Sequence, residues 1–169
     1  MILMSFIPAN AKENIGDLIN EHKLNLTVVS ERKTKRGDFR VYGNGSKKIT
    51  LNKDSNKFRF LITLLHEISH QLVFQSFGNK VRPHGIEWKK IFKEISKPFL
   101  LESIFPLSIL NAFKEYLKNP KSSTDLDLEL SISLSKFDTL SDYLYIEKLE
   151  MGQFFLYKKK VIFKKISKK

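Results

Sequence analysis

The feature that most constrains this chain is a long apolar segment, residues 56–77, with ionisable side chains in its middle. Its leucine, isoleucine, valine and phenylalanine residues cover almost the whole circumference of a helix, and a helix that is apolar all round is buried. Asp54 or Ser55 can cap its first turn, and Gly78 stands where a residue of positive φ commonly ends a helix. We therefore predict a buried helix over these residues.

The ionisable side chains belong to the pentapeptide His66-Glu67-Ile68-Ser69-His70. Residues four apart lie on nearly the same helix face, so the two imidazoles can reach one metal ion. Zinc lowers the pKa of its bound water to about 7, and a carboxylate beside it can accept the proton as that water attacks a carbonyl. Because these groups would be costly to bury without strong partners, we predict a site for one zinc ion per chain. Glu67 is the predicted catalytic residue, which would act as the general base in the hydrolysis of peptide bonds.

A catalytic zinc site of this kind needs a third protein ligand. The metzincin continuation fails, because Val73 and Ser76 occupy the positions where that motif has glycine and histidine. Two carboxylates on the next predicted helix, Glu87 and Glu94, are candidates. His84, which opens that helix, competes with them.

Short periodic segments surround the long helix. Before it, apolar and polar residues alternate, which predicts a small antiparallel sheet. After it, apolar residues recur at helical spacing, which predicts two further helices. The predicted helices are residues 10–22, 86–96 and 106–118, and the predicted strands are residues 24–28, 39–43 and 47–52. Arg36-Gly37-Asp38 is a turn signal between the first two strands.

The composition changes after a polar segment, residues 119–125, which we interpret as a linker between domains 1–118 and 126–169. Leucine and isoleucine alternate strictly with polar residues over 126–134, which is typical of a half-buried strand. The further predicted strands are residues 143–149, 153–158 and 160–166. The chain has no cysteine, so we expect a β-rich C-terminal module that holds no metal and is stabilised by hydrophobic packing alone.

The formal net charge is +12, from 30 basic and 18 acidic residues. One interpretation is attraction to DNA or another polyanion. The other is codon bias, since only five of the basic residues are arginine, which phosphate recognition usually favours. The candidate nucleic-acid contacts are Lys158, Lys159, Lys160, Lys164 and Lys165. No apolar stretch reaches the roughly 20 residues that cross a membrane, so we expect a cytoplasmic protein without a membrane partner.

Three segments of the chain resemble the SprT-like family of zinc metallopeptidases, which includes the Spartan proteases. They are the strand ending in ITLN (49–52), the helix LLHEISHQL (64–72) and the segment HGIEWKKIF (84–92). In that family the HExxH motif is followed by a loop of variable length and a His-Gly pair, with an aromatic residue three positions on. Here the pair is His84-Gly85 and the aromatic residue is Trp88, and the resemblance covers about residues 10–100.

The resemblance implies that His66, His70 and His84 bind the zinc ion and that Glu67 is the catalytic acid/base. The predicted fold class is α+β, a minigluzincin-like core with a small antiparallel sheet and an active-site helix, followed by the β-rich module. The predicted function is zinc-dependent hydrolysis of a protein or peptide substrate, with DNA-associated proteins as candidate substrates. The alternative is a zinc-binding, nucleic-acid-associated regulatory protein with little or no proteolytic activity.

Three expectations concern the surroundings of this site. An extended substrate can add to an exposed sheet edge, for which we expect the strand KKITLN (47–52). Trp88 is expected to pack its helix against the metal-binding helix, and His22 to be an ordinary surface residue. The candidate donors to the oxyanion, between which the sequence does not choose, are Tyr42, Tyr116, Arg59 and Arg82.

Overall fold

The central element of the fold is helix α2 (Lys57–Phe77), which confirms the predicted buried helix. Asn56, rather than the predicted Asp54 or Ser55, caps it by accepting hydrogen bonds from two backbone N–H groups of the first turn. The carboxylate of Asp54 instead accepts a hydrogen bond from the N–H of Asn56, so the cap lies one step further along the chain. Gly78 ends the helix as predicted, with a positive φ of 60°, but its ψ of −136° differs from the left-handed helical conformation common at this position.

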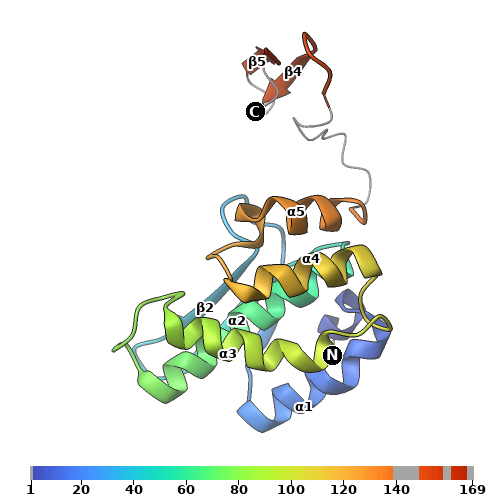
Figure 1. The fold of residues 1–169 in the computed structure, drawn as a ribbon. Coiled ribbons are helices and arrows are strands. Elements are labelled where there is room, and N and C mark those ends of the chain that lie inside the picture. The colour runs from blue at the N-terminus through green and yellow to red at the C-terminus, as the bar shows by residue number, and fades with distance from the viewer. Residues whose placement is uncertain (1, 139–148, 158–160, 167–169) are drawn as a thin grey trace. The chain divides into compact units, whose positions relative to one another are not determined.

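The computed structural model describes residues 2–138, 149–157 and 161–166. The chain divides into two units, Met1–Asp138 and Thr139–Lys169. In the first unit, α2 lies between the sheet on one side and helices α3 (Ile86–Ser96) and α4 (Leu107–Lys118) on the other (Figure 1). Both helices, and α1 (Lys12–His22), lie where the sequence predicts them. The short 3₁₀ helices are η1 (Ile2–Phe6), η2 (Ala9–Ala11), η3 (Lys97–Phe99) and η4 (Thr124–Leu126).

The sheet has three strands, β1 (Leu26–Val29), β2 (Gly37–Val41) and β3 (Lys47–Asn52), in the order β1-β3-β2. Strand β3 runs antiparallel to β2 but parallel to β1, so the predicted all-antiparallel sheet is wrong. The chain crosses from β1 to the far edge before the β2–β3 hairpin returns it to the centre, and this route makes the β1–β3 pair parallel. The expected substrate edge, KKITLN, is therefore the central strand, and β2 is an edge strand.

The core of the first unit is built around the apolar face of α2. Its largest fully buried side chains include Phe60 of α2, Trp88 and Phe92 of α3, and Phe113 of α4. Trp88 stacks on Phe92 with ring centroids 4.9 Å apart. Burying such aromatic side chains dominates core energetics, so this cluster holds α3 and α4 firmly against α2.

Residues Leu128–Ser135 form helix α5, so the predicted strand over 126–134 is wrong. Asp127 caps the helix, since its carboxylate accepts a hydrogen bond from the N–H of Leu130. Leu130 and Leu134, one helical turn apart, are buried, whereas the other leucines of the segment are exposed. The alternating sequence also places these two leucines at i and i+4, which is helical spacing. Packing of both side chains against the rest of the first unit favours the helix over the strand.

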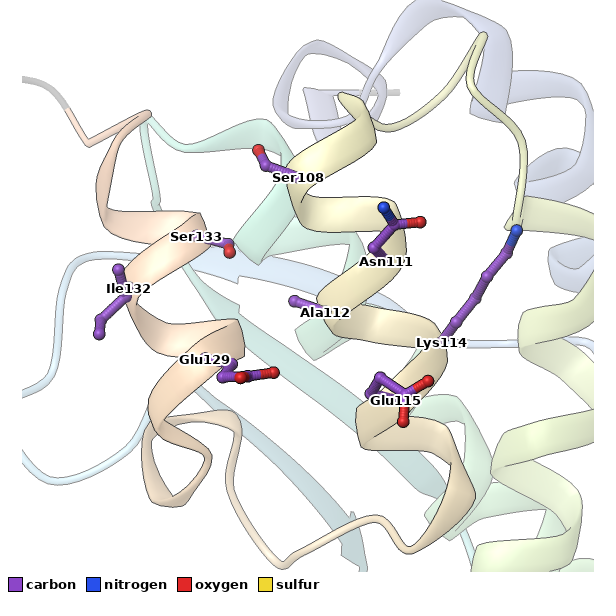
Figure 2. Close-up of a pocket in the computed structure, with 8 residues that line it drawn as sticks. All are labelled: Ser108, Asn111, Ala112, Lys114, Glu115, Glu129, Ile132 and Ser133. Carbon is purple, nitrogen blue, oxygen red and sulfur yellow. The ribbon is translucent and has the colours of Figure 1, made fainter.

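A shallow groove with a volume of about 460 Å³ lies between α4 and α5 (Figure 2). Its lining residues are Ser108, Asn111, Ala112, Lys114, Glu115, Glu129, Ile132 and Ser133. They are mostly small or charged, and none of them belongs to the histidine cluster described below.

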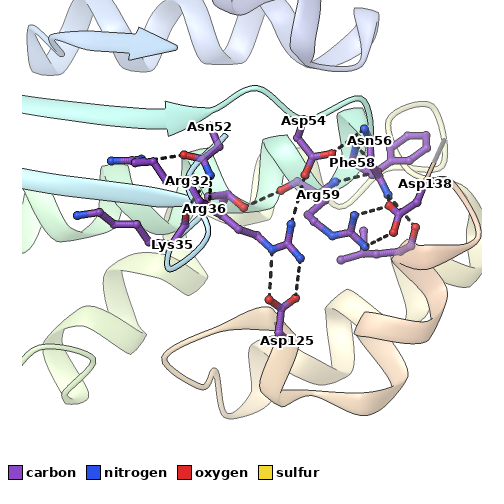
Figure 3. A network of polar contacts seen from close by, with 12 residues as sticks. Arg32, Lys35, Arg36, Asn52, Asp54, Asn56, Phe58, Arg59, Asp125 and Asp138 are labelled. Carbon is purple, nitrogen blue, oxygen red and sulfur yellow. Dashed lines mark hydrogen bonds and ion pairs between the residues drawn. The ribbon is translucent and has the colours of Figure 1, made fainter. Parts of the chain in front are cut away.

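Two arginines join the end of the first unit to the region around the start of α2 (Figure 3). Arg59, in the first turn of α2, forms an ion pair with Asp138 through both terminal guanidinium nitrogens. The guanidinium of Arg36 binds the carboxylate of Asp125, with Nε 3.2 Å from Oδ2. These contacts hold α5 and its flanking residues against the rest of the first unit. The division of the chain accordingly falls after Asp138 and does not coincide with the linker predicted at 119–125.

The second unit contains an antiparallel hairpin of β4 (Phe154–Tyr157) and β5 (Val161–Lys164). Both strands confirm the sequence prediction. The strand predicted over 143–149 lies almost wholly outside the described residues. None of the described helices is long and apolar enough to cross a membrane.

Candidate metal centre

Two histidines of α2 and one histidine of the following loop point their ring nitrogens at one another. The Nε2 atom of His70 lies 3.1 Å from that of His66 and 3.0 Å from that of His84, and the His66 and His84 Nε2 atoms are 3.1 Å apart. Among the residues that the structure describes, these three histidines form a group that could hold a metal ion. In a tetrahedral site with bonds of about 2.0–2.1 Å, neighbouring ligand nitrogens are roughly 3.3 Å apart. The cluster comes close to that spacing.

The helix and the loop bring these side chains together in different ways. His66 and His70 are four positions apart in the sequence and so lie on one face of α2. His84 reaches them because its backbone is left-handed, with φ of 58°, a conformation uncommon for residues other than glycine. The N–H of Gly85 donates to the carbonyl oxygen of Arg82 at 3.0 Å, which closes the turn before α3. The chain thus keeps an unfavourable backbone conformation where it serves the cluster.

The Trp88 side chain packs against the imidazole rings of the cluster. Its ring lies 4.6 Å from that of His66, 4.8 Å from His84 and 5.5 Å from His70. Its indole N–H donates to the backbone carbonyl of His66 at 3.4 Å. The expectation that Trp88 packs α3 against the metal-binding helix is confirmed, and the same side chain also contacts all three imidazoles.

The protonation of the cluster fits a metal ion. Burial and the neighbouring imidazoles lower the pKa of His66 to about 2 and that of His70 to about 4, and burial lowers the pKa of His84. All three rings are therefore neutral at pH 7, as metal ligation requires. Each Nε2 offers either one proton or one lone pair, so three that face one another cannot all be paired among themselves. A metal ion accepts all three lone pairs, and imidazole suits zinc, copper, iron and nickel.

Glu67 follows His66 on α2 and is almost fully buried, with 7% of its surface exposed. Burial raises the pKa of Glu67 to about 8, and the charge of Asp38 adds to the effect. A hydrogen bond from the backbone of Phe39 and the charges of Arg32 and Lys35 act in the opposite direction. A cation held by the imidazoles would lower this pKa, because an opposite charge favours the carboxylate.

Residues at the start of strand β2 lie against Glu67. The sequence pattern predicts a turn over residues 36–38 and so does not single them out. Gly37 lies directly against the Glu67 side chain. Burial acts to raise the pKa of Asp38, but hydrogen bonds from Lys35 and Arg40 outweigh it and the pKa is lowered. No local pattern distinguishes Gly37 from an ordinary turn residue, so the sequence offers no signal of this contact.

The other candidate ligands lie outside the cluster. The carboxylate of Glu94 forms an exposed ion pair with Lys97 at 2.8 Å. Glu87 lies in the first turn of α3 with its carboxylate next to Gly85. His22 is half-buried at the end of α1, with Nε2 3.7 Å from Glu21. Neither of the two carboxylates nor His22 belongs to the group of side chains that could hold a metal ion in the described structure.

The four candidate oxyanion donors differ in their availability. The guanidinium of Arg59 is paired with Asp138. The buried hydroxyl of Tyr116 donates to a backbone carbonyl at 2.7 Å. Tyr42 and Arg82 are exposed, on the β2–β3 turn and on the loop that carries the third histidine, and these two remain candidates.

The predicted nucleic-acid contacts lie in the second unit. Lys164 has its ammonium 5.4 Å from the centre of the Phe154 ring, and the ammonium of Lys165 donates to the carbonyl oxygen of Leu149 at 2.7 Å. The other three lysines, residues 158–160, lie outside the described residues.

Comparison with known proteins gives one family for most of the first unit. Residues 10–109 match the model of the SprT-like family. The chain is similar to Protein SprT of Glaesserella parasuis serovar 5, with 45% identity over 47 residues, 28% of this chain and 29% of that protein. It is 46% identical over 33 residues, 20% of each chain, to Protein SprT of Pseudomonas paraeruginosa and of Pseudomonas aeruginosa. The matches thus span less than a third of these curated relatives. No solved structure matches the chain.

Proposed function

The chain belongs to the SprT-like family, whose model matches more than half of it, and from this premise we propose that it is a zinc-dependent metallopeptidase. The observation that carries the proposal is the cluster of three Nε2 atoms, 3.0–3.1 Å apart, on a helix in which the buried residue Glu67 directly follows His66. A purely structural zinc site commonly has four protein ligands. Three imidazoles and an adjacent carboxylate are the composition of a catalytic one.

In this proposal His66, His70 and His84 hold the zinc ion, within a minigluzincin-like core formed by the sheet, α2 and α3. Zinc held there supplies a Lewis acid that makes water a nucleophile near neutral pH. Glu67 accepts the proton of the attacking water on its carboxylate and delivers it to the leaving amine. Its burial suits it to both transfers, because burial brings the pKa of the carboxyl group towards neutral pH, where the group can both accept and release the proton.

The free edge of β2 is the proposed place for an extended peptide. Backbone bonds from Asn52 to Arg36 and from Tyr42 to Ser46 show that the even-numbered residues of this strand pair with β3. In an antiparallel ladder the alternate residues then direct their N–H and C=O groups outward. Residues 37, 39 and 41 therefore direct backbone groups away from β3. The backbone of Phe39 donates a hydrogen bond to Glu67, which leaves those of residues 37 and 41 for a substrate strand to add to. This edge replaces the KKITLN strand expected from the sequence.

A second candidate function rests on the charge of +12. The same fold could serve a zinc-binding regulatory protein that associates with nucleic acid, or a peptidase whose substrates are bound to DNA. The presence of Glu67 favours the peptidase, since a site that only holds zinc has no need of a base.

The test measures zinc content and casein cleavage, with and without DNA, for the full chain. We expect about one zinc per chain in the wild type and in Glu67→Gln, with cleavage reduced about 10²–10⁴-fold in the variant. His84→Ala should lose most of its zinc, whereas His22→Ala, which removes a histidine outside the cluster, should keep it. Wild-type cleavage by Glu67→Gln would exclude Glu67 as the base, and a wild type that cleaves nothing would support the regulatory alternative.

A further inference from the structure

Gly37, the first residue of β2, makes the closest approach of the sheet to Glu67. A Cβ atom built on Gly37 would lie 2.6 Å from both Cγ and Oε1 of Glu67 and 2.9 Å from its Cδ. All three distances are far below a van der Waals contact between carbon atoms, about 3.5–4.0 Å. Any other residue at this position would therefore displace the Glu67 side chain.

The pattern of β2 explains why the space exists on this side of the strand. Alternate residues share a face, and Phe39, two residues on, packs on Phe74 of α2 with ring centroids 6.0 Å apart. Asp38 and Arg40 share the opposite face, where their side chains bind each other. Gly37 thus occupies a position that faces α2, where a side chain would normally fill the gap and where Glu67 fills it instead.

Backbone conformation does not account for the glycine. The positive-φ glycines of the described chain are Gly45, Gly78 and Gly152, and Gly37 is not one of them. Glycine within a strand is otherwise unfavourable, because it loses more conformational freedom on folding and contributes no packing. The cost is offset only where the missing side chain makes room for another group.

We propose that Gly37 is a positioning residue, which holds open the space that the Glu67 side chain occupies between β2 and α2. The catalytic part of this inference rests on the proposed peptidase function. The steric part does not, since it concerns only whether Gly37 and Glu67 share one space.

The steric part is tested on the metal-free protein by urea unfolding of Gly37→Ala, Glu67→Ala and the double variant. We expect Gly37→Ala to lower the midpoint in the wild-type background, and to lower it by less than half as much once the Glu67 side chain has been removed. Gly43→Ala is the matched control. Gly43 follows β2, a Cβ there would meet nothing within 4 Å, and its effect should be the same in both backgrounds. Equal losses from Gly37→Ala in both backgrounds would overturn the proposal.

The catalytic part is tested on the zinc-loaded full chain. Gly37→Ala should keep its zinc and its KM but lose at least about tenfold in kcat, approaching the loss of Glu67→Gln. In the Glu67→Gln background the same substitution should cost little further activity. Wild-type kcat in Gly37→Ala would overturn the positioning role. If the wild type cleaves nothing, the proposed function fails, and the urea experiment alone decides whether Gly37 makes room for Glu67.

Discussion

At the scale of single residues, the site brings together groups whose charged forms are all disfavoured by burial. The histidines respond by staying neutral, because burial lowers their pKa values. Glu67 responds by retaining its proton, because burial raises its pKa to about 8. Without a cation, the cluster therefore holds little charge at pH 7. The energetic cost of ionising Glu67 should then be visible in the stability of the metal-free protein.

We expect the metal-free protein to lose stability relative to metal-free Glu67→Gln as the pH rises from 6.5 to 8.5. The folded pKa of Glu67 is raised above its unfolded value, so its stabilising contribution is fully present below about 4.5 and is lost through about 8. The slope between the two values approaches about 1.4 kcal/mol per pH unit. The three histidines act in the opposite direction near pH 6.5, because their folded pKa values are lowered and the unfolded rings still lose protons there. They do so equally in both proteins, so the difference between the two proteins reports Glu67.

The measurement is urea unfolding of both proteins in the presence of a chelator at intervals of pH. A parallel loss of stability in the two proteins would show that another group titrates, and would contradict the burial of Glu67 in the metal-free state.

At the scale of elements, α5 is held by a mixture of apolar and ionic contacts. Its two buried leucines pack on the first unit, and the amide of Asn56 donates to the carbonyl oxygen of Leu134 at 2.7 Å. The same amide and the guanidinium of Arg59 bind the carboxylate of Asp138 (Figure 3). Arg59 is buried and its Nε has no hydrogen-bond partner within the described structure. Its charge therefore depends on Asp138.

Removing the Asp138 carboxylate should destabilise the protein much more than removing that of Asp125. Breaking a buried pair by deleting one partner costs about 3–5 kcal/mol, and Asp138→Asn should cost somewhat less because its side chain is 22% exposed. The pair of Arg36 with Asp125 is about half exposed on both sides, so Asp125→Asn should cost at most about 1 kcal/mol.

Chemical denaturation of the two variants and the wild type gives the comparison directly. Equal, small losses in both variants would show that water replaces Asp138 at Arg59, and that the apolar contacts alone hold α5.

At the scale of the whole molecule, the positive charge is the feature that the proposed chemistry does not use. The chain carries +12 overall, and its last part is rich in lysine. Within the described hairpin, Lys165 is engaged with the backbone. Strand β5 pairs with β4, so deleting residues 158–169 would also remove a strand. Charge substitutions therefore test DNA binding better than truncation.

We expect non-specific DNA binding to weaken when four lysines of the second unit are replaced by glutamine. The substituted residues are Lys158, Lys159, Lys160 and Lys164. Each lost phosphate contact should reduce the slope of log affinity against log salt by nearly one unit. A control variant changes the net charge equally at four exposed lysines of the first unit, Lys12, Lys57, Lys90 and Lys114.

Salt titrations of DNA affinity for the wild type and both variants separate location from total charge. Equal changes in the two variants would mean that charge acts over the whole surface. If no protein binds DNA at about 50 mM salt, the lysines reflect codon bias or solubility, and a nucleic-acid partner is excluded.

The sequence by itself determined the parts of this protein that depend on local spacing. The apolar pattern around residues 56–77 predicted α2, and the four-residue spacing of His66 and His70 placed both on one face of it. Helices α3 and α4 and the β4–β5 hairpin followed from periodicity and turn signals in the same way. The resemblance to the SprT-like family, carried by short motifs, is confirmed by the match over residues 10–109.

Only the tertiary structure decided the features that depend on contacts between distant segments. Spacing left the third ligand open between His84 and two carboxylates, and the left-handed turn before α3 brings His84 to the other histidines. The alternating leucines after residue 125 suited a strand, but in the folded chain Leu130 and Leu134, one helical turn apart, are both buried. Gly37 looked like a turn residue because nothing local reveals that Glu67, 30 positions later in the sequence, occupies the space of its missing side chain.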